Sequence, residues 1–163
     1  EKLVAHSSSL KKKKFRFEEL KINELGSGYY FNPIVFEIND IKEIDGEKFG
    51  PILHFIRYKQ EELDDLIDQV NATGYGLTMG AHTRILGKAN RIFKKANVGN
   101  FYLNRDIVGA VVGVQPFGGH GLSGTGPKAG GPNYLKSFLN EKTFTDNVMA
   151  TGGNIDLLNK NNQ

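Results

Sequence analysis

Residues 52–104 read ILHFIRYKQEELDDLIDQVNATGYGLTMGAHTRILGKANRIFKKANVGNFYLN, and this stretch decides the fold class of the 163-residue chain. Short apolar runs alternate here with stretches whose apolar side chains recur every three or four residues, as on one face of a helix. The apolar runs are residues 52–58, 76–82 and 100–104, and the helical stretches are residues 60–70 and 85–97. Strands and helices that alternate with short connections predict parallel strands joined by right-handed crossovers, and therefore an α/β fold.

Weaker signals flank this region. The segment YYFNPIVFEI, residues 29–38, predicts another strand, because its apolar side chains alternate and Pro33 limits pairing near its start. Residues 134–139 predict a short helix, and KTFTDNV, residues 142–148, predicts a last strand before a polar, loose tail. For residues 1–27, which are polar and basic, we expect a helical or connecting segment.

Composition excludes several classes of function. The chain has no cysteine, which rules out disulfides, zinc knuckles and a thiol nucleophile, and its four histidines are too scattered to predict a metal site. No apolar stretch approaches the roughly 20 residues that span a bilayer, and the first residues lack the apolar core of a signal peptide. We therefore expect a cytoplasmic protein without a transmembrane segment.

One dense basic run, Lys11–Lys14, is followed by Phe15 and Phe17. Such a run is more typical of a solvated helix end than of a nucleic-acid site, because binding along a phosphate backbone needs basic residues spread over a face. The formal net charge of +3 is mild. We expect no nucleic-acid binding by this chain.

A glycine-rich segment, residues 109–131, contains nine of the 20 glycines. Gly119, Gly121 and Gly124 satisfy the G-x-G-x-x-G spacing of a dinucleotide-binding loop. That spacing has meaning only between a strand and a helix whose free N–H groups face the phosphate. Pro116 interrupts any strand before it, and the glycines and prolines after it cannot continue a helix. The segment therefore predicts a long functional loop of another kind.

Several ordered motifs together resemble the C-terminal part of an aldehyde dehydrogenase, within the branch that oxidises glutamate semialdehyde (1-pyrroline-5-carboxylate). The motifs are EKFGP (47–51), ATGYGLTMGAHTR (72–84), VGNFYLNR (98–105), GAVVGVQPFGGHGLSGTGPKAGGP (109–132) and TFTDNVMATGGN (143–154). The resemblance implies part of a three-layer α/β/α catalytic domain with a mostly parallel sheet over residues 28–141. It also implies an oligomerisation strand and tail over residues 142–163.

The resemblance assigns a substrate-binding role to the glycine-rich segment. Gly109 and Ala110 would offer backbone N–H groups to the substrate carboxylate, and glycine permits the close approach. Phe117 would pack its ring on the aliphatic chain of the substrate. Family members often have serine where Ala110 stands, so the amide is kept and a hydroxyl is lost. His120 stands where we expect an acidic residue, and it receives no role.

The motif EKFGP implies a cofactor-binding role for two residues. Glu47 would accept hydrogen bonds from the nicotinamide ribose hydroxyls of NAD, and Phe49 would pack beside the nicotinamide. From five residues alone, a turn into the next strand is the simpler interpretation, and the surrounding motifs reverse that preference. Any FAD would belong to a separate proline dehydrogenase domain that is not in this chain.

The chemistry of the family starts with attack of a cysteine thiolate on the aldehyde, and this sequence has no cysteine. No region resembles the Rossmann half that binds adenosine. We therefore expect no catalytic residue here, a fragment of a longer parent protein, and no activity of the chain alone. Two alternatives stay open: a non-catalytic assembly module that forms homo-oligomers through residues 142–148, and a nucleic-acid binder that uses Lys11–Lys14.

Overall fold

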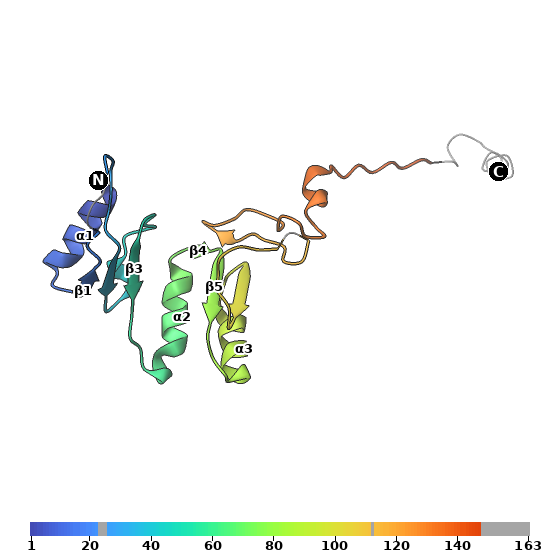
Figure 1. Ribbon diagram of the computed structural model, residues 1–163. Coiled ribbons are helices and arrows are strands. Elements are labelled where there is room, and N and C mark those ends of the chain that lie inside the picture. The colour runs from blue at the N-terminus through green and yellow to red at the C-terminus, as the bar shows by residue number, and fades with distance from the viewer. Residues whose placement is uncertain (23–25, 112, 148–163) are drawn as a thin grey trace.

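A computed structural model of the chain describes residues 1–22, 26–111 and 113–147 (Figure 1). It is a mixed α/β structure, as the sequence predicts. The helices are α1 (Lys2–Lys12), α2 (Leu63–Ala72) and α3 (Leu86–Lys95). The strands are β1 (Arg16–Glu19), β2 (Ile34–Glu37), β3 (Ile52–Phe55), β4 (Tyr75–Gly76), β5 (Thr78–Ala81), β6 (Asn100–Leu103) and β7 (His120–Gly121). Short 3-10 turns occupy Ile41–Glu43, Gln60–Glu62 and Leu135–Phe138.

The N-terminal half is a three-stranded sheet in the order β1-β2-β3, covered on one face by α1. Strands β1 and β2 are antiparallel, and β2 and β3 are parallel. Alternation along β2 turns Ile34 and Phe36 toward α1, where Leu10 meets them in a core from which water is excluded. Phe36 is fully buried, so this cluster fixes α1 on the sheet.

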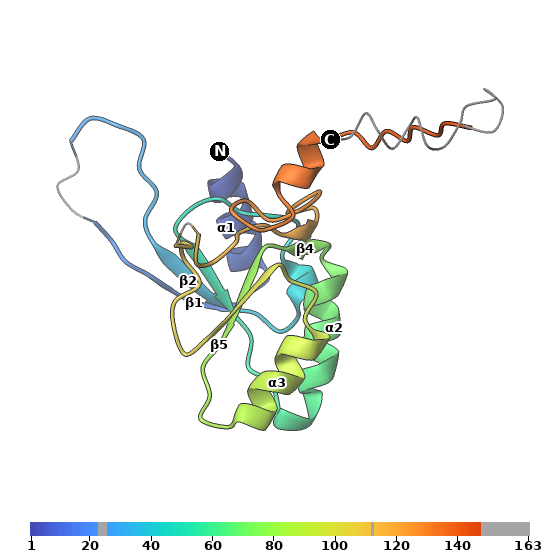
Figure 2. The ribbon, with the colours of Figure 1, turned by 90° about the vertical axis from the view of Figure 1, so that its right-hand side faces the viewer.

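The second half is built around the parallel pair β5–β6, which α3 connects. Helices α2 and α3 lie side by side against this pair (Figure 2), and Leu63, Ile67 and Ile92 form the core between them. Arg91 of α3 makes two hydrogen bonds to the carboxylate of Asp64 in α2, at 2.9 and 2.6 Å. Both the apolar contacts and this ion pair therefore hold the two helices together.

The predicted parallel pairing is present at β2–β3 and at β5–β6, but the strands do not form one continuous sheet. Strands β3 and β5, which α2 joins, belong to different sheets. A third sheet is the short antiparallel pair β4–β7. The strand predicted over residues 29–38 begins only at Ile34, because Pro33 has no N–H to donate to a neighbouring strand.

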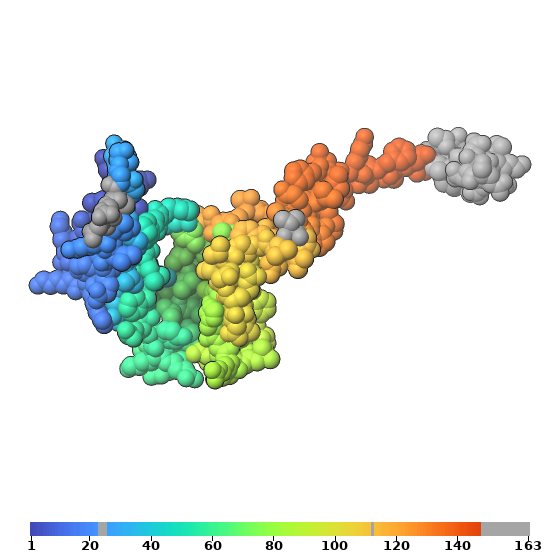
Figure 3. Space-filling view, viewed as in Figure 1, coloured from blue at the N-terminus to red at the C-terminus, as the bar shows by residue number. Residues whose placement is uncertain are grey.

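The C-terminal elements differ from the prediction. The short helix is a 3-10 turn over Leu135–Phe138. The strand predicted at residues 142–148 is absent over residues 142–147, which are exposed and project from the body (Figure 3), while Val148 and the tail lie outside the described residues. A strand needs a neighbour for its N–H and C=O groups, and no described part of the chain lies beside this segment. No helix in the described ranges is long and apolar enough to cross a membrane.

Candidate functional site

The glycine-rich segment is fastened to the first residue of β6, the buried Asn100. The side-chain amide of Asn100 donates a hydrogen bond to the carbonyl oxygen of Pro116 (3.0 Å), and its oxygen accepts one from the N–H of Gly118 (3.3 Å). These two hydrogen bonds hold the backbone in place on both sides of Phe117. Because a buried amide must satisfy its polar atoms, Asn100 fixes where the loop crosses the strand.

Lys128, later in the glycine-rich segment, also binds the residues at the start of β6. Its ammonium group donates to the carbonyl oxygen of Gly99 and lies 3.4 Å from the side-chain oxygen of Asn100. Phe117 and Ala129 exchange two backbone hydrogen bonds, at 3.1 and 3.0 Å. The loop therefore folds back on itself, and the half-buried Phe117 sits between two supports.

The G-x-G-x-x-G glycines are explained by backbone packing. A Cβ on Gly119 would lie 2.7 Å from the carbonyl oxygen of Gly76, and a Cβ on Gly124 would overlap the carbonyl oxygen of Gly119. Gly121, in β7, has a positive φ of 59° and lies against the carbonyl of Gly74. No helix begins within residues 122–134, so the geometry of a dinucleotide loop is not present there.

The candidate anchor residues lie upstream in the same segment. Gly109 adopts a left-handed φ of 73°, has open space where a Cβ would stand, and accepts a hydrogen bond from the Tyr102 hydroxyl at 3.4 Å. Ala110 is half-buried. Within the described residues, the N–H groups of Gly109 and Ala110 have no acceptor. Two adjacent free N–H groups beside open space are suited to an anion such as a carboxylate.

The candidate cofactor segment precedes β3 and is more exposed. Glu47 lies on the rim of a cavity of about 720 Å³, which opens between the segment before β3 (cyan) and the region of α2 and β4 (green) in Figure 3. His54, Thr73 and Ser123 line the same cavity. Phe49 is 82% exposed and does not line it. A free carboxylate at a cavity edge fits a diol such as a ribose.

The structure brings some candidate residues together and leaves others apart. Glu47 shares its cavity with Ser123 of the glycine-rich segment, whose hydroxyl oxygen accepts a hydrogen bond from the N–H of Gly76 at 3.1 Å. Gly109, Ala110 and Phe117 do not line that cavity. The two candidate subsites are therefore separate in this chain.

Sequence reasoning missed the role of Asn100 and Lys128. For Asn100 the available signal was a polar residue in the otherwise apolar strand NFYL, since a buried amide in a strand needs partners. The basic run Lys11–Lys14 lies at the C-terminal end of α1, as the favoured interpretation of the sequence predicts. Lys11 pairs with Glu19 at 2.8 Å, and Lys13 pairs with Glu43 at 2.5 Å, so these two lysines tie α1 to the residues around it.

The described residues bring no three His, Asp or Glu side chains close enough to hold a metal ion. What the site offers is free backbone N–H groups, an apolar ring on a braced loop, and a carboxylate at a cavity edge. These groups are suited to binding and orienting a ligand.

The α/β fold of the chain matches that of aldehyde dehydrogenases of known structure. The model of the aldehyde dehydrogenase family matches residues 9–144, and the chain belongs to that family. The match begins before Gly28, so it takes in the end of α1 and all of β1.

The chain is similar to the bifunctional protein PutA of Escherichia coli, with 56% identity over 116 residues, which is 71% of this chain and 9% of that protein. It is 42% identical to a 1-pyrroline-5-carboxylate dehydrogenase of Oceanobacillus iheyensis over 73% of this chain and 23% of that protein. A crystal structure of a mutant of Bradyrhizobium japonicum PutA superposes with a TM-score of 0.78 and 45% identity, over 93% of this chain and 15% of the other. The predicted branch of the family is confirmed, and the chain spans only a small part of these relatives' length.

Proposed function

We propose that this chain supplies the substrate-anchor loop and the nicotinamide-ribose edge of an NAD-dependent dehydrogenase. The reaction is oxidation of L-glutamate γ-semialdehyde, the open form of 1-pyrroline-5-carboxylate, to L-glutamate in proline catabolism. The observation that carries this proposal is the pair of N–H groups at Gly109 and Ala110, which have no acceptor among the described residues. The names of the relatives support the choice of substrate.

In this proposal each candidate residue binds or orients. The N–H groups of Gly109 and Ala110 donate hydrogen bonds to the substrate carboxylate, and Phe117, braced by Asn100 and Ala129, packs on the aliphatic chain between the two polar ends. Glu47 accepts hydrogen bonds from the ribose hydroxyls, and Phe49 covers the nicotinamide. NAD, when bound, supplies the acceptor for hydride. The chain's own contribution is to fix two ligands relative to one another, which lowers the entropic part of the barrier.

The thiolate nucleophile comes, in this proposal, from another part of a longer polypeptide, because this chain has no cysteine. The isolated chain should therefore bind weakly and turn nothing over. FAD belongs to a separate proline dehydrogenase domain of that polypeptide. We place the parent in the cytoplasm and divide this chain into the leading segment 1–27, the catalytic-domain part 28–141 and the C-terminal segment 142–163.

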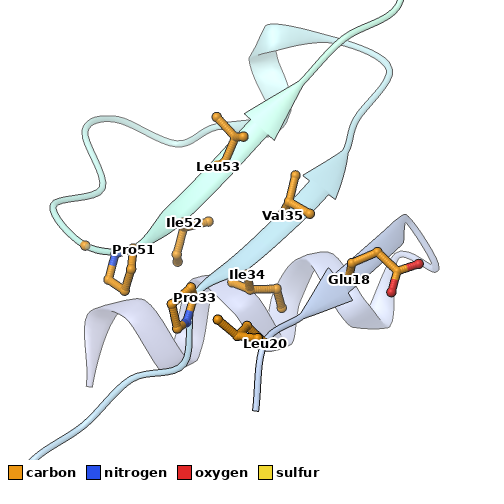
Figure 4. A pocket seen from close by; sticks show the side chains of 9 residues that line it. Glu18, Leu20, Pro33, Ile34, Val35, Pro51, Ile52 and Leu53 are labelled. Atoms are coloured by element: carbon orange, nitrogen blue, oxygen red, sulfur yellow. The ribbon is translucent and has the colours of Figure 1, made fainter. Parts of the chain in front are cut away.

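The partner that this proposal requires is the rest of the parent polypeptide. One face of the sheet β1-β2-β3 is covered by α1, while the other is bare, with Val35 and Leu53 side by side on neighbouring strands (Figure 4). Leu53 is 62% exposed. Leu20, which lines the same shallow pocket shown in Figure 4, is 64% exposed. Apolar side chains left in water on part of a sheet face favour a covering layer, and we assign that layer to the parent.

A second role, assembly of a homo-oligomer, is supported by the C-terminal segment. Residues 142–147 are exposed, and Phe144 is 87% exposed. In a dimer this segment forms the strand that it lacks here, because a strand of the partner subunit can satisfy its backbone groups. If assembly is the only role of the chain, the chain is the non-catalytic assembly module considered in the sequence analysis.

The test of the main proposal uses the intact parent with Phe117→Ala. Loss of a large apolar contact should lower kcat/KM for glutamate semialdehyde by an amount equivalent to about 1–3 kcal/mol and raise KM, while NAD affinity stays unchanged. Phe138→Ala is the matched control, since its ring is 70% exposed on the Leu135–Phe138 turn and has no assigned role, and it should not alter KM. An unchanged kcat/KM in Phe117→Ala would place the ring away from the substrate.

A further inference from the structure

Two histidines far apart in the sequence meet where α1 lies on the sheet. The Nε2 atoms of His6, in α1, and His54, in β3, are 2.8 Å apart, and the rings meet edge to face with centroids 5.0 Å apart. His6 is only 9% exposed, and the His54 ring stacks on the fully buried Phe36. The pair is therefore part of the contact that holds α1 on the sheet.

The same helix also contacts the segment that carries Glu47 and Phe49. A Cβ on Gly50 would overlap the side chain of Leu3, so Leu3 packs directly on the Gly50 backbone, one residue after Phe49. The N–H of Ile52 bonds to the carbonyl of Gly50 at 2.8 Å, which continues the segment into β3. Residues 45–51 are thus held between α1 and the strand that bears His54.

We propose that the His6–His54 pair positions the segment 45–51 against α1, and that protonation of both rings releases helix and segment together. A hydrogen bond between two Nε2 atoms requires that one carry a proton and the other a lone pair. The bond survives a first added proton, which only makes it charge-assisted, and it is lost when both rings are imidazolium. His6 and His54 are then positioning residues for the cofactor segment, acting through Leu3 and Gly50.

The surroundings of the pair make both histidine rings harder to protonate. Burial is the main cause that lowers the pKa of both His6 and His54, and the ammonium group of Lys48 lowers both further. Lys13, at the end of α1, also lowers the pKa of His6, while Asp45 opposes the change. Because the rings bind protons more weakly in the folded state, the stability of this contact is complete above about pH 6.5. It is lost as the pH falls below that value through the lowered pKa values.

The experiment is hydrogen exchange of the 163-residue chain, read by mass spectrometry without NAD and corrected for intrinsic rates. Between about pH 7.5 and about pH 5, exchange in α1 should rise about tenfold while α2 and α3 stay protected, and the amide NMR signals of residues 45–50 should shift over the same pH range. The double variant His6→Gln with His54→Gln keeps donors and acceptors without the titration, so its rise should fall below about twofold. The exposed His82→Gln is the matched control and should keep the wild-type response.

Several results would overturn the proposal. They are a tenfold rise that persists in the double variant, unchanged amide signals of residues 45–50 while exchange in α1 rises, and a lack of protection in α1 at neutral pH. If the double variant does not fold, the wild type still decides. The ring nitrogens of His54 and the amide signals of residues 45–51 must then titrate with one midpoint in NMR spectra, and different midpoints refute the coupling.

The inference rests on the proposed function only where it assigns Glu47 and Phe49 to the cofactor. Glu47→Gln in the intact parent tests that assignment by NAD binding. If NAD affinity is unchanged, the cofactor role fails while the exchange coupling stands. If the coupling fails, the cofactor role is untouched.

Discussion

Lys128, in the glycine-rich segment, and Asn100, at the start of β6, contact each other through their side chains. The Lys128 ammonium lies 3.4 Å from the Asn100 side-chain oxygen, which also accepts from the N–H of Gly118. One buried amide therefore organises the crossing of the loop over β6, and together with the backbone bridge to Ala129 it fixes the backbone at Phe117.

Asn100→Ala should destabilise the fold by about 1–3 kcal/mol, because it leaves the carbonyl of Pro116 and the N–H of Gly118 without their partner. Urea unfolding measures the loss. Asn97→Ala is the matched control, since the Asn97 side chain is exposed, and it should change stability by less than about 0.5 kcal/mol. Equal effects of the two substitutions would mean that Asn100 does not brace the loop.

Gly99→Ala and Gly87→Ala should move stability in opposite directions. A Cβ on Gly99 would overlap the carbonyl oxygen of Gly118, so the loop must shift and unfolding becomes easier. Gly87 lies in α3 with open space around it, and alanine there should stabilise by about 0.4–1 kcal/mol through the unfolded state. Melting temperatures of the two variants give the comparison, and a neutral Gly99→Ala would contradict the close approach.

Gly109→Val tests whether the left-handed glycine serves the ligand or only the turn. Gly113 is its control, because it has a similar φ of 79° and equally open surroundings, so valine strains both positions alike. In the intact parent, Gly109→Val should reduce kcat/KM for glutamate semialdehyde far more than for a simple aldehyde of the same length. Gly113→Val should affect both substrates by similar factors. Equal losses on both substrates in Gly109→Val would end the assignment of a carboxylate anchor.

The ion pair between α2 and α3 should make stability depend on acid. Hydrogen bonds from Arg91 are the main cause that lowers the pKa of Asp64 below its usual value of 3.8. A lowered carboxyl pKa contributes stability that is present above 3.8 and is lost as the pH falls through the lowered value. The stability difference between wild type and Asp64→Asn, from urea unfolding, should therefore shrink on acidification. Asp65→Asn, in the same helical turn, should show a smaller change.

Much of the fold follows from periodicity. The apolar stripes of α2 and α3 and the alternation in β2 are strong local signals, and the short connections favour the parallel pairing seen at β5–β6. The division into three sheets could not be predicted, because no local pattern says which strand lies beside which. The strand expected at residues 142–148 fails for the same reason, since its pairing depends on a neighbour and not on its own residues.

The candidate site divides in a similar way. Glu47 and Gly109 were found through a resemblance, and the residues alone did not separate ligand contact from turn geometry. The sequence did not predict the roles of Asn100, Lys128 and the His6–His54 pair. Each depends on a partner at least 16 residues away, such as Pro116 for Asn100. The glycines of the G-x-G-x-x-G run could be rejected as a nucleotide loop from Pro116 before them and the glycines and prolines after them. The contacts that require these glycines come from β4 and from the loop itself.

The separation of β3 from β5 has a consequence for handling the molecule. Each strand is paired on one side within the described residues, so each offers the other side to any extended peptide in solution. Produced by itself at high concentration, the chain should add strands from its own copies at these borders and form larger particles over time, which light scattering detects. Coexpression with a polypeptide that pairs with the free edges of β3 and β5 should keep the preparation monodisperse.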